Sequence, residues 1–296
     1  MMIAYKERQV TRSGIMILDI IVTLEDKEKS VVNIYNKLEE ELKSIKHNII
    51  FVDNASSDKT LELLKNIQKD NESCVKIISF SKKFDKDTSI YAGVLHSKHD
   101  LICIYDTESA TTHITKMYEY LKEHNECDQV CMTSNYVETN FFKKTYLKLF
   151  NRMFNLKYDI NKSFYRMFRK NVKNAIIEYT KYNPFSVYTF EELGFNTYYL
   201  KYENKKIDKP NYCKLTNYSN SQYKIIQFCN LFLLGLTLIY FILIAFKLFK
   251  VSNTVILLFI LLSIIVNVYL YSLVFKKKEK TYFLVKEMIG FDENVL

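Results

Sequence analysis

Short apolar runs alternate with amphipathic stretches through the first part of the chain. The apolar runs have the length of strands and lack a polar face, as expected of strands that are covered on both sides. They occupy residues 15–23, 48–53, 75–80, 101–105 and 129–133. The stretches between them place apolar side chains at helical spacing, at residues 27–45, 58–67, 88–96 and 114–123. This alternation predicts an α/β fold with a mostly parallel sheet and right-handed crossovers.

Two uncharged runs near the C-terminus, residues 225–246 and 251–275, have a different character. As helices they would each be about 33 Å long or longer, enough to cross a hydrocarbon core of ~30 Å. Lysines are denser at 276–280 than in the loop between the runs, which has only Lys247 and Lys250. This bias favours a hairpin with both ends in the cytoplasm. No apolar run precedes residue 15, so we expect no cleaved signal peptide.

Residues 141–168 combine basic and aromatic side chains at helical spacing. One interpretation is a helix packed on the sheet, and the other is an interfacial helix that lies among lipid headgroups. A further aromatic run at residues 198–202 predicts one more strand before the first span.

Charge and cysteine content narrow the possible partners. The net charge is +9, but the basic residues are scattered without a recognition motif, so we expect no nucleic acid and attribute the charge to an anionic lipid surface. The six cysteines show no paired framework, and we expect them to be reduced. His124, Cys127 and Cys131 are spaced like zinc ligands, but Cys131 falls in an apolar run and no fourth ligand is near, so buried thiols are expected.

Acidic side chains follow the predicted strands at their carboxyl ends, where ligands of parallel α/β sheets gather. Asp106 and Glu108, after the fourth strand, offer hard oxygen ligands that can share Mg²⁺ or Mn²⁺ with a diphosphate. Asp53, at the end of the second strand, is placed to accept hydrogen bonds from a base or a ribose, while Asp58 would cap the next helix. Asp26 follows the first strand. The plain alternative is a set of βα turns without a ligand.

Four motifs occur in order along the chain: IIFVDNASSDKT at 49–60, SKKFDKDTSIYAG at 81–93, DTE at 106–108 and YRM at 165–167. The first is similar to FVDDGSxDxT and the second to SRNFGKExAxxAG. The third stands in the place of a DxD motif, and the fourth resembles a phenylalanine-arginine-leucine motif. With the two C-terminal spans, this set resembles the family-2 glycosyltransferases, in particular the polyprenyl-phosphate branch of dolichyl-phosphate mannose synthase-like and GtrB-like enzymes.

This resemblance implies a GT-A head, which is Rossmann-like, followed by a two-helix transmembrane hairpin. It implies an inverting enzyme of the cell membrane, with head and tail in the cytoplasm. The reaction it implies is transfer of a sugar from a nucleotide-sugar donor to a polyprenyl phosphate lipid, with a UDP-sugar as the family's common donor. Assembly into a homo-oligomer through the spans is a further expectation.

The resemblance also assigns roles to individual residues. Asp53 would contact the nucleotide base, and Lys86 would face the donor phosphates. Asp26 and Asp58 would complete the donor site. Arg166 would bind the acceptor phosphate as a bidentate partner, together with Lys205, which stands where the family has an arginine. The residues implied to hold Mg²⁺ or Mn²⁺ are Asp106 and Glu108.

Departures from the family pattern leave a second hypothesis open. Ala55 and Asp85 replace motif glycines, and a side chain at either position would obstruct close approach of the backbone to a ligand. The alternative is therefore a catalytically lapsed homologue that serves as a membrane-bound partner or scaffold.

The sequence thus predicts four parts. Residues 1–140 form a nucleotide-sugar-binding GT-A domain, and residues 141–224 form acceptor-side and interfacial helices. Residues 225–275 form the transmembrane hairpin, and residues 276–296 form a basic cytoplasmic tail.

Overall fold

The computed structural model describes the head of the chain and a short piece of its C-terminal tail. The described residues are 16–107, 113–134, 162–181, 185, 189–202 and 282–291. Both predicted spans, Glu108 and Lys205 lie outside these residues, as does most of the basic aromatic stretch that begins at residue 141.

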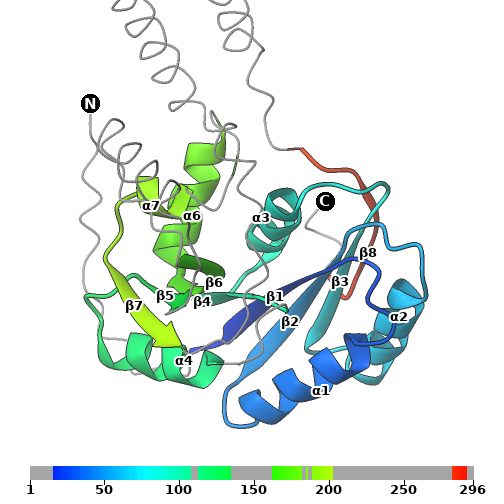
Figure 1. Ribbon diagram of the computed structural model, residues 1–296, viewed down its shortest axis with the longest axis horizontal. Coiled ribbons are helices and arrows are strands. Elements are labelled where there is room, and N and C mark those ends of the chain that lie inside the picture. Colours follow the sequence, from blue (N-terminus) through cyan, green and yellow to red (C-terminus); the bar gives the residue numbers. More distant parts are fainter. Residues whose placement is uncertain are drawn as a thin grey trace, which may run out of the picture.

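One eight-stranded sheet organises the described residues, in the order β7-β5-β6-β4-β1-β2-β3-β8 (Figure 1). The strands are β1 (Leu18–Leu24), β2 (His47–Asp53), β3 (Val75–Phe80), β4 (Leu101–Tyr105), β5 (Gln129–Ser134), β6 (Lys162–Arg169), β7 (Thr197–Tyr202) and β8 (Val285–Ile289). β4, β1, β2 and β3 are parallel neighbours, and β7 runs parallel to β5. β6 and β8 run antiparallel to the strands beside them. The predicted α/β fold with a mostly parallel sheet is confirmed.

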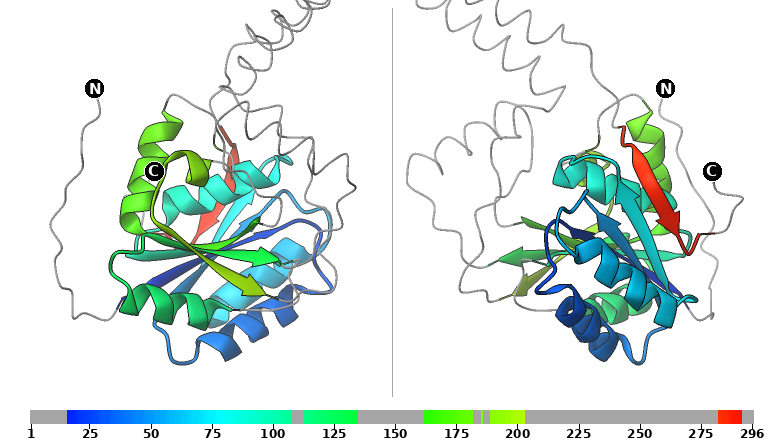
Figure 2. Two further views of the ribbon diagram at one scale, coloured as in Figure 1. Left: turned by 60° about the vertical axis from the view of Figure 1, so that its left-hand side comes forward. Right: turned by 90° about the vertical axis from the view of Figure 1, so that its right-hand side faces the viewer.

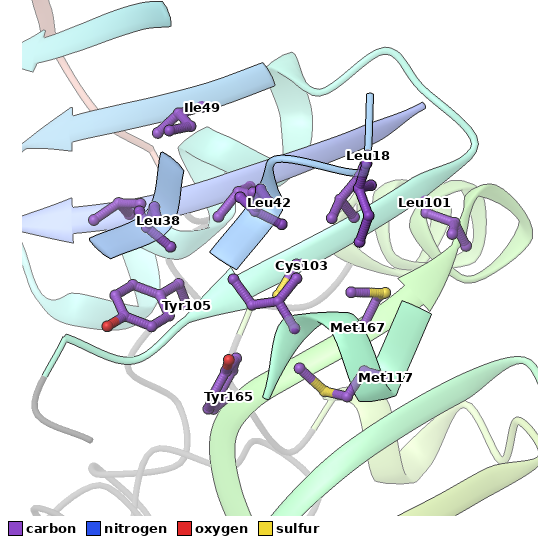
Figure 3. Packing of buried hydrophobic residues seen from close by; sticks show 14 of the residues in the cluster. Leu18, Leu38, Leu42, Ile49, Leu101, Cys103, Tyr105, Met117, Tyr165 and Met167 are labelled. Carbon is purple, nitrogen blue, oxygen red and sulfur yellow. The ribbon is translucent and has the colours of Figure 1, made fainter. Parts of the chain in front are cut away.

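Helices cover both faces of the sheet (Figures 1 and 2). One face carries α1 (Val31–Leu42), α2 (Thr60–Asp70) and α4 (Ile114–Glu123); the other carries α3 (Lys86–His96), α6 (Lys170–Thr180) and the short α7 (Thr189–Glu192). Figure 3 shows the first of these two cores, where Leu38 and Leu42 of α1 and Met117 of α4 lie against strand residues such as Cys103. The central strands are buried on both faces, so neither face requires polar side chains. Their sequences are therefore continuous apolar runs.

The prediction of a helix through residue 168 is wrong for residues 162–168, which belong to β6. Tyr165 and Met167 pack on the α1 and α4 side, while Phe168 packs on the α6 side and Arg166 lies over the ring of Phe190. This is the two-residue alternation of a strand. β6 inserts between β4 and β5, so the sheet continues past the predicted boundary at residue 140.

A close approach of α3 to β1 depends on Gly93. A Cβ atom at this position would lie 2.3 Å from Cγ2 of Ile21, and also within 3.2 Å of two further atoms of that side chain. Ile21 is fully buried and β-branched, so it has little freedom to move aside. Glycine therefore sets the height at which α3, and the loop that precedes it, sits over the sheet.

The tail supplies one strand of the sheet. β8 pairs antiparallel with the edge strand β3, with Ile77 opposite Ile289 and Phe80 opposite Val285. Gly290 follows β8 with φ +80°, a conformation that L side chains rarely adopt. A pairing between positions that are about two hundred residues apart was not predicted from the sequence.

None of the helices formed by the described residues is both long enough and apolar enough to cross a membrane. The predicted hairpin at residues 225–275 lies outside the described residues.

Candidate functional site

Three of the predicted acids lie at the same edge of the sheet. Leu24 at the end of β1 pairs with Asp53 at the end of β2, and Val22 pairs with Tyr105, which directly precedes Asp106. β1 separates β2 from β4, so the strand ends that bear Asp53 and Asp106 are two strand spacings, about 10 Å, apart. Asp26 follows β1 between them. The fourth acid, Glu108, lies outside the described residues.

Asp53 is buried and held by its neighbours. The residue is only 1% exposed. The hydroxyl of Ser79 on β3 donates to Oδ2 at 2.9 Å, and the backbone N–H of Ser56 donates to Oδ1 at 3.3 Å. These bonds fix the direction of the carboxylate at the carboxyl edge, and its contact with a nucleotide base stays a prediction.

Asp26 ties the loop after β1 to the loops after β2 and β3. It adopts φ +49°, and its carboxylate accepts hydrogen bonds from the backbone N–H of Ser57 at 2.7 Å and from the hydroxyl of Ser57 at 3.1 Å. The ammonium group of Lys83 lies 2.8 Å from the other oxygen. The hydrogen bond with Lys83, followed by that from Ser57, lowers the pKa of Asp26 to about 2. The carboxylate is therefore ionised throughout the physiological range.

Asp58 has a tethering role, and its prediction as the helix N-cap is wrong by one residue. α2 begins at Thr60 with Lys59 as its N-cap. The Asp58 carboxylate accepts hydrogen bonds from the backbone N–H of Thr60 at 2.9 Å and from that of Glu28 at 3.0 Å. It thus joins the first turn of α2 to the segment that leads into α1.

Asn54 was not singled out by the sequence, yet it holds two loops of the site together. Its amide nitrogen donates to the carbonyl of Phe84 at 2.8 Å and to a carboxylate oxygen of Glu25 at 2.9 Å. Its amide oxygen accepts from the backbone N–H of Phe84 at 2.8 Å. Asn54 is 5% exposed, and its amide group both donates to and accepts from the backbone of the 81–85 loop, as the peptide group of a paired strand does. The only sequence signal was its place directly after a strand end.

Lys86 and Asp106 face each other across the edge of the sheet. Nζ of Lys86, the first residue of α3, lies 3.5 Å from Oδ1 of Asp106. The Lys86 side chain is 38% exposed and that of Asp106 15% exposed, so solvent reaches both. The N-terminus of a helix adds partial positive charge here, and a lysine at that position favours anionic ligands such as a diphosphate.

The two replaced glycines have different consequences. Ala55 adopts φ +51°, a left-handed conformation that costs an L residue roughly 1–2 kcal/mol. Asp85 adopts an extended conformation and serves as the N-cap of α3, where its carboxylate accepts from the backbone N–H of Thr88 at 2.7 Å. Glycine is therefore dispensable at residue 85, while the turn at residue 55 keeps the backbone form that glycine prefers.

His113 and Ile114, the first two described residues after Thr107, are anchored to β6 and α1. The backbone N–H of His113 donates to the hydroxyl of Tyr165 at 2.9 Å, and that of Ile114 donates to Glu41 at 2.8 Å. Burial raises the pKa of Glu41. Figure 3 shows the Tyr165 ring close to Tyr105, which precedes Asp106.

Arg166 lies inside the fold. It is 1% exposed and stands opposite Ile104 of β4, two residues before Asp106. Its guanidinium lies 4.2 Å from the centroid of the Phe190 ring and 4.0 Å from a carboxylate oxygen of Glu191. Contact with an acceptor phosphate stays a prediction, and it would require this cover to move.

Of the two predicted metal ligands, Asp106 lies within the described residues and Glu108 lies outside them. Within the described ranges, no group of three or more His, Cys, Asp or Glu side chains is arranged to hold a metal ion. Asp106 nevertheless offers a partly exposed carboxylate, the hard oxygen ligand that Mg²⁺ and Mn²⁺ prefer. The Cys127 thiol donates a hydrogen bond to the carbonyl of Gln129, and the His124 ring stacks on that of Tyr120.

Comparison with known families gives one match that covers most of the head. The profile of Glycosyl transferase family 2 matches residues 19–193, more than half of the chain. The matched range contains the carboxyl edge described above, from Asp26 to Asp106.

Curated relatives of similar length carry glycosyltransferase names. CsbB of Bacillus subtilis (strain 168) is 27% identical over 246 residues, which cover 76% of this chain and 74% of that protein. YkcC of the same organism is 25% identical, covering 79% and 78%, and sll0501 of Synechocystis sp. (strain ATCC 27184 / PCC 6803 / Kazusa) is 24% identical, covering 68% and 67%.

Among solved structures, glucosyl-3-phosphoglycerate synthase of Mycobacterium tuberculosis, in complex with Mn²⁺, uridine diphosphate and glucosyl-3-phosphoglycerate, matches with a TM-score of 0.49. Its identity is 11%, and the match covers 71% of this chain and 78% of that one. A likeness of this degree does not identify the donor or the acceptor of the present chain.

Proposed function

The chain belongs to glycosyl transferase family 2 and is thus a glycosyltransferase with a nucleotide-sugar donor, and we propose that it transfers the sugar to a polyprenyl phosphate at the cell membrane. The proposed donor is a UDP-sugar, and the reaction proceeds with inversion at the anomeric carbon. The head and the tail lie on the cytoplasmic side, where the donor is dissolved.

The pair Lys86 and Asp106 carries this proposal. A cation and a carboxylate whose charged atoms lie 3.5 Å apart, both reached by solvent, can together bind a metal-bound diphosphate, the cation through phosphate oxygens and the carboxylate through the metal ion. Lys86 would attract the donor phosphates, while Asp106, with Glu108, would hold Mg²⁺ or Mn²⁺. When bound, the metal ion offsets the charge that develops on the departing nucleoside diphosphate.

The remaining chemistry is mainly positioning. Asp53 would accept an N–H of the base, because Ser79 and Ser56 hold its carboxylate at the carboxyl edge. The acceptor phosphate is already ionised and is itself the nucleophile, so a strong general base is not required. The protein then contributes by aligning the two reactants and neutralising charge.

The place of the C-terminal tail supports a membrane-bound acceptor. The second predicted span ends at Phe275, and Tyr282 is the next described residue, seven positions later. Seven residues of fully extended chain cover at most about 25 Å. Leu284, two residues after Tyr282, contacts Ser81 directly after β3. If the span ends at Phe275, the carboxyl edge of the sheet therefore lies no farther from the bilayer than about 25 Å plus the length of two extended residues.

A lipid-linked transfer assay tests the proposal. Membranes that contain the protein are supplied with labelled UDP-sugars and undecaprenyl phosphate, and the lipid product is identified by mass spectrometry. We expect Asp106→Asn to lower the transfer rate by at least ~100-fold, since it removes a group that holds the metal and its charge. Asp70→Asn, on the exposed end of α2, is the matched control and should be active.

The same assay separates the lapsed homologue from the enzyme. A lapsed protein would transfer no sugar from any donor, and the wild type and Asp106→Asn would be equally inactive. Binding of a nucleotide sugar that is strengthened by Mn²⁺, measured by calorimetry, would argue against lapse.

A further inference from the structure

The tail contacts more of the head than its strand pairing requires. Past the end of β3, the backbone N–H of Ser81 donates to the carbonyl of Leu284 at 2.9 Å. The hydroxyl of Ser81 donates to the same oxygen at 3.2 Å. Figure 1 shows that the tail begins beside the connection between β3 and α3 and then lies along β3. The tail therefore touches the loop at residues 81–85 as well as the edge of the sheet.

Aromatic packing extends this contact. The ring of Tyr282 meets the ring of Phe84 edge to face, with centroids 6.3 Å apart. The ring of Phe283 lies 5.5 Å from that of Phe80, and 6.4 Å from that of Tyr91 on α3. Edge-to-face and tilted aromatic pairs stabilise a contact beyond the area that they bury. The loop is thus held between β3, α3 and the tail.

The other side of this loop faces the functional site. Asn54 bonds both backbone polar groups of Phe84. Lys83 pairs with Asp26 at 2.8 Å and with Glu25 at 3.0 Å. Lys86, just after the loop, faces Asp106. The segment between Ser81 and Lys86 therefore contacts the tail on one side and the acids of the site on the other.

We propose that Tyr282 and Phe283 are positioning residues of the donor site, which hold the 81–85 loop so that Lys83 and Lys86 reach the acids of the carboxyl edge. This inference rests on the proposed function only in naming the ligand as a nucleotide sugar. It makes donor affinity depend on a tail that follows the predicted membrane hairpin. Docking of the tail on the head is then coupled to formation of the donor site.

Three variants of the full-length protein in detergent test this coupling. Tyr282→Ala/Phe283→Ala removes both rings, and Tyr282→Phe keeps the ring without its hydroxyl. Phe291→Ala is the matched control, because it removes the same kind of side chain from the far end of the tail, where it contacts His96 and Lys76. The probe is UDP with Mn²⁺, titrated by calorimetry. We expect the double variant to bind about tenfold more weakly, and the other two to bind like the wild type.

Amide hydrogen exchange tests the same coupling without any ligand. The N–H groups of Ser81 and Phe84 are bonded to Leu284 and Asn54. We expect both to exchange faster in the double variant than in the wild type and in Phe291→Ala. If the wild type binds no UDP, the proposed donor is wrong, and the exchange result alone decides this inference. Unchanged exchange in the double variant overturns the inference. So does a result in which Phe291→Ala speeds exchange in the loop, or weakens UDP binding, as much as the double variant does.

Discussion

Nζ of Lys86 lies 3.5 Å from Oδ1 of Asp106 at the carboxyl edge of the sheet. Lys86 opens the helix that Asp85 caps, and Asp106 directly follows the buried strand β4. Solvent reaches both groups, since the Lys86 side chain is 38% exposed and that of Asp106 is 15% exposed. An anion that carries its own cation would satisfy both groups at once, which is what a metal-bound nucleoside diphosphate provides.

Removal of the Lys86 charge should weaken donor binding more than the chemical step. A charge-assisted hydrogen bond contributes roughly 1.5–3 kcal/mol, so Lys86→Met is expected to raise the KM for the nucleotide sugar by about 10–100-fold. Steady-state kinetics with a varied donor measures this effect. Lys69→Met, in the last turn of α2, is the control and should leave KM unchanged. An unaltered KM in Lys86→Met would show that Lys86 does not contact the donor.

Asn54→Asp should destabilise the loops around the site. The substitution replaces the amide donor by a carboxylate oxygen opposite the carbonyl of Phe84 and the carboxylate of Glu25. Loss of a buried donor costs about 1–3 kcal/mol. We expect a lower free energy of unfolding in urea, and faster amide exchange at Phe84. A variant as stable as the wild type would mean that the loops are held chiefly by other contacts.

Gly93→Ala should also destabilise the fold, through overpacking. The new Cβ would lie 2.3 Å from Cγ2 of Ile21, and such insertions typically cost about 1–3 kcal/mol. Ile21→Ala on its own leaves a cavity, yet it removes the atom that clashes. The double variant should therefore lose less stability than the sum of the two single variants, by roughly 0.5–3 kcal/mol. Strict additivity in urea unfolding would contradict this geometry.

Acid should loosen the packing beneath the tail through His96. Burial, with a further contribution from the charge of Lys173, lowers the pKa of His96 below its ordinary value, and its ring contacts those of Phe283 and Phe291. The unfolded chain therefore binds this proton more readily than the folded chain. The free energy of unfolding should fall as pH drops below about 6.5, and it should be fully retained above that value.

The matched variant for this pH dependence is His96→Gln. Urea unfolding at pH 5 and pH 7.5 should show a smaller difference in His96→Gln than in the wild type. Equal pH dependence in both proteins would show that protonation of His96 does not affect stability.

The central sheet could be predicted from the sequence because its strands are buried on both faces. Continuous apolar runs such as residues 75–80 and 101–105 match β3 and β4 in both bounds. β6 was missed because its Lys, Arg and aromatic residues also fit helical spacing, and only the sheet makes their two-residue alternation visible. β8 was missed because its partner is remote in sequence, so no local pattern indicates the pairing.

The candidate site could be predicted in outline for a similar reason. Parallel strands bring their carboxyl ends to one edge, so acids after strands predict a common site, and the structure brings Asp26, Asp53 and Asp106 there. The contacts that shape the site could not be predicted. Asn54 acts on a loop that is remote in sequence, and the burial of Arg166 depends on α7, which lies beyond β6. Such contacts depend on how the elements pack.

The most direct test of the account is transfer of a labelled sugar to undecaprenyl phosphate in membranes that contain the wild type or Asp106→Asn. We expect a new sugar-phosphate lipid from at least one nucleotide sugar with Mn²⁺ or Mg²⁺ present, its loss on chelation of the metal, and its loss in Asp106→Asn. A lipid product that forms equally well with Asp106→Asn would contradict the assigned site. No lipid product from any donor, together with no metal-linked binding of nucleotide, would contradict the proposed reaction.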